Sequence, residues 1–336
     1  MNIGTRIHFG KFGKNSMRNQ MKGKNVLVTG GAGLVGGHLV EKLLSLGAKV
    51  VVLDIVVKPK SYFVSQKLDE RAKLIIQDVR DLVKLKELIL TENISYIFHL
   101  AAQALVPLAY ENPALTLDTN IMGTVNVLEA ARLIPSVKAV VVASSDKAYG
   151  KDCRNAVENQ TLAGDHPYDV SKSAADLICT AYFKTYGIPI TVSRFGNIFG
   201  PGDINFNRII PGMMRSAIKN EILELRSDGT FKRDYVYVKD VVDGYICLAE
   251  QIDKAKGEAF NFSSGFNFSV LNLIEKVSQV IGKKIEYKIV NNQKNEIPEQ
   301  SLNFDKAGKI LEWQAKYSLA DGINETYEWY FHLFSL

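Results

Sequence analysis

The amino-acid sequence predicts a doubly wound α/β fold, in which helices cover both faces of a parallel sheet. Short apolar runs rich in β-branched residues, such as "NVLVT", "KVVVLD" and "KAVVVAS", alternate with longer amphipathic segments. Runs that are apolar on both faces are typical of parallel strands buried on both sides. The chain has 336 residues, of which 46% are hydrophobic, and this composition suffices for a large buried core.

The predicted elements follow one another in regular order up to residue 195. Each apolar run is read as a strand, and each amphipathic segment after it as a helix. The predicted strands are residues 25–29, 49–54, 73–78, 96–102, 138–144 and 189–195, and the predicted helices are 34–46, 82–90, 120–133 and 168–186.

The alternation becomes less regular after residue 195, which predicts a second, smaller lobe. Helices are expected at 209–219, 238–252 and 270–281, with short strands between them. We expect residues 23–195 to form the first domain, with a return segment near 236–262. Residues 196–235 and 263–336 would then form the smaller lobe over the carboxyl ends of the strands.

Residues 1–22 are basic and polar and are expected to form a flexible extension. They carry five of the basic residues behind the net charge of +5, so the remainder is close to neutral. A nucleic-acid partner is therefore not expected. No apolar stretch reaches the length of a membrane span, and residues 1–22 lack the apolar centre of a signal peptide. The three cysteines, Cys153, Cys179 and Cys247, have no metal-ligand spacing, and we expect reduced thiols in a cytoplasmic protein without a metal.

The segment "TGGAGLVGG" predicts a dinucleotide site in the first domain, which makes it a Rossmann-type NAD-binding domain. Glycines at 30, 33 and 36 lie between a strand and a helix, where small residues let the backbone approach a pyrophosphate at the helix N-terminus. Asp54 ends the second strand, where it would accept from the ribose hydroxyls and repel a 2′-phosphate, which favours NAD over NADP. Asp78 could reach the adenine or could instead cap a helix. The residues expected at the cofactor are Gly30, Gly33, Leu34, Val35, Asp54, Asp78, Val79, Leu100, Ala101, Ala102, Tyr168 and Lys172.

Two further patterns indicate catalysis. "YDVSK" places Tyr168 and Lys172 on one face of a helix, where the ammonium and a positive nicotinamide would lower the pKa of the phenol. The strand at 138–144 ends in "SSDKAYG", which places Ser145, Asp146 and Lys147 at its carboxyl end. The alternative is that Asp146 only caps or turns the chain and that Lys147 points to solvent.

With these patterns the sequence resembles the extended short-chain dehydrogenase/reductase family of NAD-dependent nucleotide-sugar epimerases and dehydratases. The resemblance covers residue 24 to the C-terminus and rests on "VTGGAGLVGGHL", "FHLAAQ", "SSDKAYG", "PYDVSK", "SRFGNIFGPGD" and "RDYVYVKDV". It implies a catalytic triad of Ser145, Tyr168 and Lys172. The pair Asp146 and Lys147 is similar to that of the CDP-glucose 4,6-dehydratases, whereas "RDYVYVKDV" departs from that group and follows the general family.

The resemblance implies a lyase of polysaccharide biosynthesis that makes a 4-keto-6-deoxy sugar nucleotide. Tyr168 would take the proton of the sugar 4-hydroxyl, Asp146 would be the acid for the leaving 6-hydroxyl, and Lys147 would be the base or stabilise the enolate. Residues expected at the substrate are Gln103, Val106, Asn197, Asn205, Arg208 and Arg233. Loop packing is the alternative for Gln103 and Val106, and a surface salt bridge is the alternative for Arg233.

Other functions remain open at this point. A 4-epimerase would need Tyr168, Lys172 and Ser145 but has no use for an acid at Asp146. A reductase that releases NADH and a non-catalytic NAD-sensing protein on the same fold are further alternatives. The helices predicted at 120–133 and 168–186 would suit the usual homodimer of the family.

Overall fold

The structure is a computed structural model that describes residues 20–151, 153–291 and 297–335. Residues 1–19 of the predicted extension lie outside the described residues. Of its last residues, Met21 is fully buried in the core.

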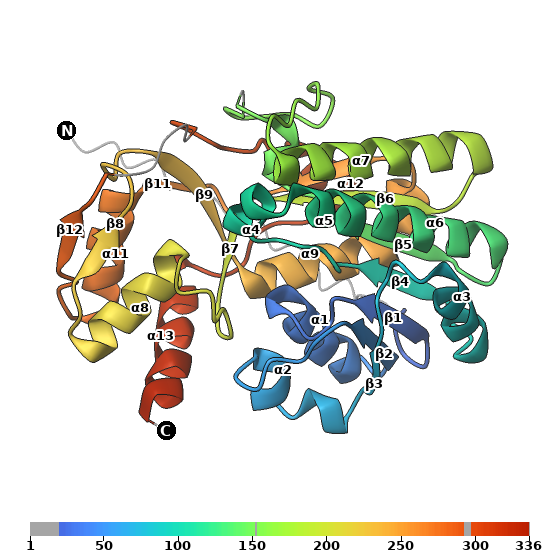
Figure 1. Ribbon diagram of the computed structural model, residues 1–336, viewed down its shortest axis with the longest axis horizontal. Coiled ribbons are helices and arrows are strands. Elements are labelled where there is room, and N and C mark those ends of the chain that lie inside the picture. Colours follow the sequence, from blue (N-terminus) through green and yellow to red (C-terminus); the bar gives the residue numbers. More distant parts are fainter. Residues whose placement is uncertain (1–19, 152, 292–296, 336) are drawn as a thin grey trace, which may run out of the picture.

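The doubly wound α/β fold predicted from the sequence is confirmed (Figure 1). A seven-stranded sheet has the order β10-β6-β5-β4-β1-β2-β3, and every neighbouring pair is parallel. The order reverses direction between β1 and β4, and ligands bind at such a switch point in open α/β sheets. The strands are β1 (Asn25–Thr29), β2 (Lys49–Asp54), β3 (Lys73–Ile76), β4 (Tyr96–His99), β5 (Ala139–Ala143), β6 (Ile190–Phe195) and β10 (Ala259–Phe262).

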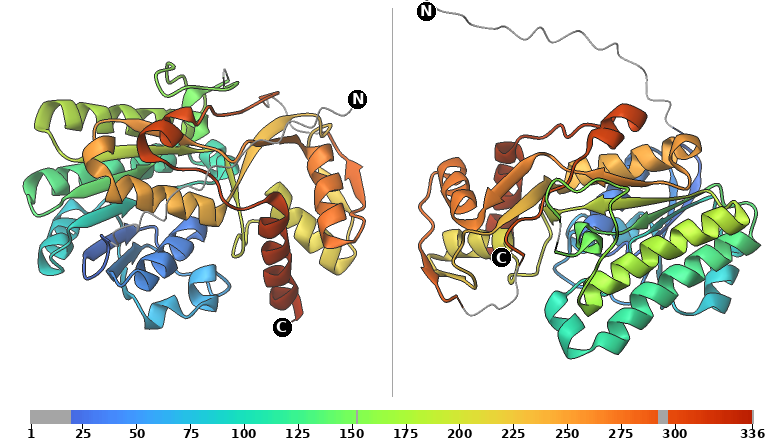
Figure 2. Two further views of the ribbon diagram at one scale, coloured as in Figure 1. Left: turned by 180° about the vertical axis from the view of Figure 1, so that it is seen from behind. Right: turned by 90° about the horizontal axis from the view of Figure 1, so that it is seen from above.

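Helices cover both faces of this sheet, because its strands are apolar on both sides. The helices α1 (Leu34–Ser45), α9 (Val238–Glu250) and α12 (Asp305–Leu311) share one core with the first face. The helices α3 (Leu82–Thr91), α6 (Gly123–Leu133) and α7 (Pro167–Tyr186) share a second core with the other face, where α6 and α7 lie side by side (Figure 2). Shorter helices complete this part: α2 (Tyr62–Ser65), η1 (Leu68–Glu70), α4 (Val106–Glu111), α5 (Pro113–Leu117), η2 (Asp118–Met122), η3 (Asp146–Tyr149) and α10 (Ile252–Ala255).

The remaining elements form a smaller lobe with its own core, seen at the left of Figure 1. Its three-stranded sheet has the order β11-β9-β7 and its two-stranded sheet pairs β12 with β8. The elements are β7 (Asn197–Phe199), α8 (Ile209–Lys219), β8 (Leu223–Leu225), β9 (Lys232–Tyr237), β11 (Phe266–Ser269), α11 (Val270–Ile281), β12 (Tyr287–Ile289) and α13 (Leu319–Ser335).

Two glycines of the first loop are required by close approach of the backbone. Gly30 has a φ of 70°, and a Cβ there would lie 2.7 Å from the Ala101 backbone nitrogen. A Cβ on Gly36 would lie 2.2 Å from the Gly30 carbonyl oxygen. Only glycine fits both positions, which lets α1 begin directly above the end of β1.

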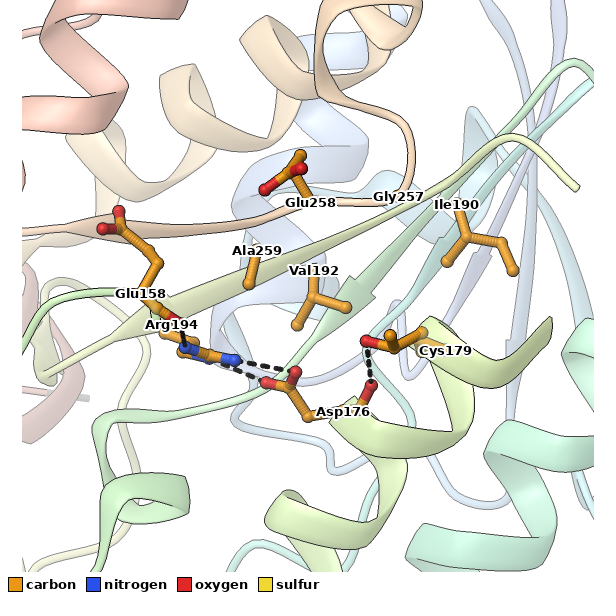
Figure 3. A pocket seen from close by; sticks show the side chains of 10 residues that line it. Glu158, Asp176, Cys179, Ile190, Val192, Arg194, Gly257, Glu258 and Ala259 are labelled. Carbon is orange, nitrogen blue, oxygen red and sulfur yellow. Dashed lines mark hydrogen bonds and ion pairs between the residues drawn. The ribbon is translucent and has the colours of Figure 1, made fainter. Parts of the chain in front are cut away.

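A buried ion pair joins α7 to β6. The Arg194 Nε and NH2 groups donate to the two carboxylate oxygens of Asp176 at 2.7 and 2.8 Å. Both side chains are almost fully buried, at 4% and 3% exposed, beside a cavity of about 150 Å³ (Figure 3). Arg194 also donates to the Tyr149 hydroxyl at 2.6 Å. The pair therefore links α7, β6 and η3.

Removal of Asp176 tests this link. Asp176→Ala leaves the Arg194 guanidinium buried without its counter-ion, so we expect the free energy of unfolding to fall by about 3–5 kcal/mol. The measurement is urea denaturation followed by circular dichroism. The control Lys309→Ala breaks the exposed pair between Lys309 and Asp305 and should cost at most about 0.5 kcal/mol. Equal losses in the two variants would contradict the assignment.

Candidate active site

A cleft of about 1850 Å³ lies at the carboxyl edge of the large sheet and is lined by residues from both parts of the chain. A pocket for one small ligand measures roughly 300–1000 Å³, so this cleft has room for two. Every residue predicted at the cofactor lines it: Gly30, Gly33, Leu34, Val35, Asp54, Asp78, Val79, Leu100, Ala101, Ala102, Tyr168 and Lys172.

The glycine loop and Asp54 form the half of the cleft that fits a dinucleotide. Gly33 is the N-cap of α1 and no side chain caps this helix, which leaves N–H groups of its first turn for an anion. Asp54 accepts hydrogen bonds from the backbone N–H groups of Ala32 and Ile55 at 3.0 and 2.8 Å. Each carboxylate oxygen has a second lone pair, so Asp54 can also accept from ribose hydroxyls.

Asp78 does not cap the following helix. The N-cap of α3 is Asp81, whose side chain accepts from the Lys84 N–H at 3.1 Å. The Asp78 carboxylate instead pairs with Arg80 at 2.6 Å, and this hydrogen-bonded guanidinium lowers the pKa of Asp78. The capping alternative is therefore wrong, because the helix begins three residues later.

Tyr168 and Lys172 lie in the first turns of α7 and face the cleft together. The Lys172 Nζ donates to the Ala143 carbonyl at 2.9 Å and lies 5.9 Å from the centre of the Tyr168 ring. Burial lowers the pKa of Lys172 to about 8. Burial also raises the pKa of Tyr168 to about 12, against the opposing charge of Arg208. In the protein chain by itself burial outweighs the nearby charges, and the lowering of the phenol pKa expected from Lys172 and a positive nicotinamide stays a prediction.

Ser145, Asp146 and Lys147 follow β5 and begin the short helix η3. The Ser145 hydroxyl donates to Asp146 Oδ1 at 3.0 Å and accepts from the Lys147 N–H at 3.2 Å, so Ser145 is the cap of η3. The Asp146 side chain is buried, at 3% exposed. The Lys147 Nζ is half-buried and donates to the side-chain oxygen of Gln300. The solvent-pointing alternative for Lys147 is therefore wrong, because Gln300 holds its amino group.

Several buried polar atoms around η3 have no hydrogen-bond partner among the described residues. Such atoms are rare in folded proteins, and a cluster of them usually marks a place that a ligand or water satisfies. They are Ser144 Oγ, Asp146 Oδ2, Asp169 Oδ1 and Gln300 Nε2.

Asp169 and His166 belong to this site, although the sequence analysis did not single them out. His166 Nδ1 accepts from the Tyr168 N–H at 3.1 Å, so a neutral imidazole carries its proton on Nε2, which lies 3.4 Å from Asp169 Oδ1. Burial raises the pKa of Asp169 to about 7, against the opposing charge of Lys147. The available signal was an acid directly after the tyrosine of "PYDVSK".

Gln103 and Asn120 organise the loop after β4. The Gln103 side chain donates to Thr116 Oγ1 at 2.8 Å and accepts from the Leu105 N–H at 2.5 Å, so it joins this loop to α5. Asn120 Oδ1 accepts from the Gln103 N–H at 2.7 Å, and its Nδ2 donates to Ser171 Oγ at 2.9 Å. The sequence predicted that a helix starts at Asn120, and this is wrong. Asn120 lies inside the π-helical segment η2, between α5 and α6. Widened turns of this kind often occur at functional sites.

The other residues predicted at the substrate line the same cleft. Val106 begins α4, Asn197 begins β7, and Arg233 lies on β9. Arg208 NH1 pairs with Asp203 Oδ2 at 3.1 Å. The full predicted set that lines the cleft is Gln103, Val106, Asn197, Asn205, Arg208 and Arg233. Among the described residues, no helix is long and apolar enough to cross a membrane, and no three acidic, histidine or cysteine side chains gather in a way that could hold a metal.

The raised pKa of Asp169 predicts a pH dependence of stability. The ordinary value is 3.8 and the folded value is about 7, so between these pH values the folded state binds more protons than the unfolded state. The free energy of unfolding contributed by this carboxyl is complete below the ordinary pKa and is lost as the pH rises to about 7. We expect Asp169→Asn to flatten the fall in stability between pH 5 and 7.5 by roughly 1–3 kcal/mol, measured by urea denaturation. An unchanged slope would contradict the assignment, and Asp305→Asn is the exposed control.

Comparison with known proteins places this geometry among enzymes that act on nucleotide sugars. The CDP-glucose 4,6-dehydratase of Salmonella typhimurium is 32% identical over 93% of this chain and 92% of that protein. The UDP-glucuronic acid decarboxylase 5 of Arabidopsis thaliana is 30% identical over 93% of this chain and 89% of its own length. The crystal structure of UDP-glucuronic acid 4-epimerase from Bacillus cereus, in complex with UDP-glucuronic acid and NAD, has a TM-score of 0.84. It is 25% identical and covers 92% of this chain and 99% of its own.

The names of these three relatives give three different reactions. A sequence model of the NAD dependent epimerase/dehydratase family matches residues 26–263 of this chain. The matched residues include the glycine loop, the end of β5 and the first turns of α7. The chain therefore belongs to the NAD dependent epimerase/dehydratase family, and NAD is its cofactor.

Proposed function

We propose that the protein is a nucleotide-sugar 4,6-dehydratase similar to CDP-glucose 4,6-dehydratase, a lyase that forms a 4-keto-6-deoxy sugar nucleotide. The observation that carries the proposal is the arrangement at the end of β5. Asp146 is buried, holds Ser145 through one carboxylate oxygen, and has no hydrogen-bond partner on the other among the described residues. An acid with a free oxygen beside the redox residues suits the removal of a hydroxyl group from the substrate.

The glycine loop and the first turn of α1 would hold the pyrophosphate of NAD, and Asp54 its ribose. Bound NAD supplies the hydride acceptor and donor of the cycle. Tyr168 removes the proton of the sugar 4-hydroxyl, and Ser145 orients the same oxygen. The ketone formed at carbon 4 acidifies the hydrogen at carbon 5, which Lys147 removes. Asp146 protonates the 6-hydroxyl, which leaves as water.

Proton balance gives Ser145 a second task in this cycle. After one elimination Tyr168 has gained the proton of the 4-hydroxyl, Lys147 has gained the proton of carbon 5, and Asp146 has lost a proton to the leaving water. Lys147 would return its proton to carbon 5 when hydride is delivered to carbon 6. The cycle closes when one proton passes from Tyr168 to Asp146. The Ser145 hydroxyl donates to Asp146 at 3.0 Å, and Ser145 and Tyr168 line the same cleft, so Ser145 would pass this proton from Tyr168 to Asp146.

The same residues argue against the other activities in the family. A 4-epimerase inverts carbon 4 and leaves carbon 6 unchanged, so Asp146 and Lys147 would have no part in it. A UDP-glucuronic acid decarboxylase acts on a substrate with a carboxylate at carbon 6. Such a substrate has no hydroxyl group at carbon 6 for Asp146 to protonate.

The predicted substrate contacts and dimer are part of the proposal. Arg208 and Arg233 line the cleft, where they would pair with diphosphate oxygens. Exposed apolar side chains on α6 and α7, at Leu133, Leu177 and Tyr186, would be covered in a homodimer.

Identification of the product tests the reaction. The protein is incubated in heavy water with CDP-, dTDP-, GDP- and UDP-glucose and with UDP-glucuronic acid, and the products are analysed by mass spectrometry and NMR. We expect loss of one water with deuterium at carbon 5 from a nucleotide glucose. Inversion of carbon 4 without loss of water, or loss of carbon dioxide from UDP-glucuronic acid, would reject the proposal.

Substitution of Asp146 tests its role as the acid. Asp146→Asn keeps the shape and the contact with Ser145 but cannot donate the proton, so we expect kcat for dehydration to fall about 10²–10⁴-fold. Oxidation of carbon 4, followed by NADH absorbance, should continue. The control Asp165→Asn removes an exposed acid at the rim, paired with Lys151, and should dehydrate at close to the normal rate. Normal dehydration by Asp146→Asn would show that this carboxyl is not the acid.

A further inference from the structure

Gln300 is a buried side chain that contacts Lys147 from a distant part of the sequence. Its residue is 0% exposed, and its side-chain oxygen accepts from the Lys147 Nζ across 153 residues of sequence. The ammonium form of lysine has only donors, so in that form the amide oxygen, and not the amide nitrogen, faces the amino group. Gln300 is absent from the residues predicted from the sequence.

The backbone around Gln300 is fixed by elements of the smaller lobe. The Gln300 N–H donates to the Lys232 carbonyl at 3.1 Å, and its own carbonyl accepts from Asn267 Nδ2 at 2.7 Å. The neighbouring Leu302 N–H donates to Asp234 Oδ2 at 2.9 Å. Strands β9 and β11 thus hold the residue in place, so the position of its side chain is set by the lobe and not by η3.

The side-chain nitrogen of Gln300 indicates a role beyond stability. Gln300 Nε2 is buried without a hydrogen-bond partner among the described residues, which costs free energy that an apolar side chain would not. A neutral amide oxygen accepts a hydrogen bond from both the amine and the ammonium form of a lysine. The amide also adds no negative charge to a site that already holds two acidic side chains, Asp146 and Asp169. Asp146 contributes to the raised pKa of both Asp169 and Cys153.

We infer that Gln300 is a positioning residue for Lys147, whose amino group it holds in place for the proton transfer at carbon 5. This inference rests on the proposed dehydratase function. In the step, the Lys147 amine takes the proton at carbon 5, and the electrons of the broken C–H bond form the enolate of the 4-ketone. The enolate then expels the 6-hydroxyl as water with the proton of Asp146. Gln300 acts only through Lys147 and takes no part in oxidation at carbon 4.

The test separates the elimination from the oxidation that precedes it. Gln300→Leu removes the acceptor, so we expect deuterium exchange at carbon 5 and dehydration to slow about 10–100-fold, because a displaced base loses its reactive geometry. The rate of carbon 4 oxidation and KM should stay close to normal, so NADH and the 4-keto sugar accumulate. The exposed control Gln279→Leu, on α11, should behave as the unaltered protein.

A second variant guards against misfolding and tests the need for a neutral acceptor. Gln300→Glu keeps the acceptor atom and the shape, but its carboxylate would favour the ammonium form of Lys147. We expect the pH profile of elimination to move to higher pH while the profile of carbon 4 oxidation stays in place.

The outcomes distinguish the two proposals. Parallel slowing of oxidation and elimination in Gln300→Leu, with no shift of the pH profile in Gln300→Glu, would show a structural role and overturn the inference. If the unaltered protein dehydrates no nucleotide sugar, the proposed function fails, and the role of Gln300 in it fails with it.

Discussion

The hydrogen bonds of the Arg194 guanidinium join β6 to α7 and η3, the two helices that carry the candidate catalytic residues. Arg194 on β6 pairs with Asp176 on α7 and donates to the Tyr149 hydroxyl on η3. Tyr149 in turn donates to Asn261 on β10 at 2.8 Å. A charge buried this deeply needs all its partners, because each missing hydrogen bond would leave the guanidinium without compensation. The residues at the end of β5 and on α7 are therefore held in one frame.

Buried polar atoms on the cleft side of this frame have fewer hydrogen-bond partners than those in its interior. The interior uses the paired charges of Arg194 and Asp176, whereas Asp146 Oδ2 at the cleft and Gln300 Nε2 on the residue that contacts Lys147 have no hydrogen-bond partner among the described residues. Folding tolerates this cost where the surrounding structure fixes the groups, and such groups are then ready for a ligand. The raised pKa of Asp169 and the lowered pKa of Lys172 have the same cause, which is burial of groups that water would otherwise keep charged.

Local sequence patterns predicted the fold closely because each pattern has a local cause. Apolar β-branched runs became parallel strands, and the predicted helix at 34–46 is observed as Leu34–Ser45. The segment around Asn120 was predicted to start a helix, but the helical segment already begins at Pro113 and widens into a π turn. That turn depends on hydrogen bonds of Asn120 to Gln103 and Ser171, which come from distant parts of the chain and leave no periodic trace in the sequence.

The sequence by itself determined the parallel sheet, the NAD site and the presence of Ser145, Asp146, Lys147, Tyr168 and Lys172 at one edge of the fold. These follow from glycines that permit close approach, from strand ends that share an edge, and from helical spacing. Only the tertiary structure decided which groups surround them. Gln300 reaches Lys147, and His166 lies 3.4 Å from Asp169, through contacts that no spacing encodes. The direction of each pKa shift was also decided there, because burial depends on the whole packed chain, and at Tyr168 burial outweighs the charge of Arg208.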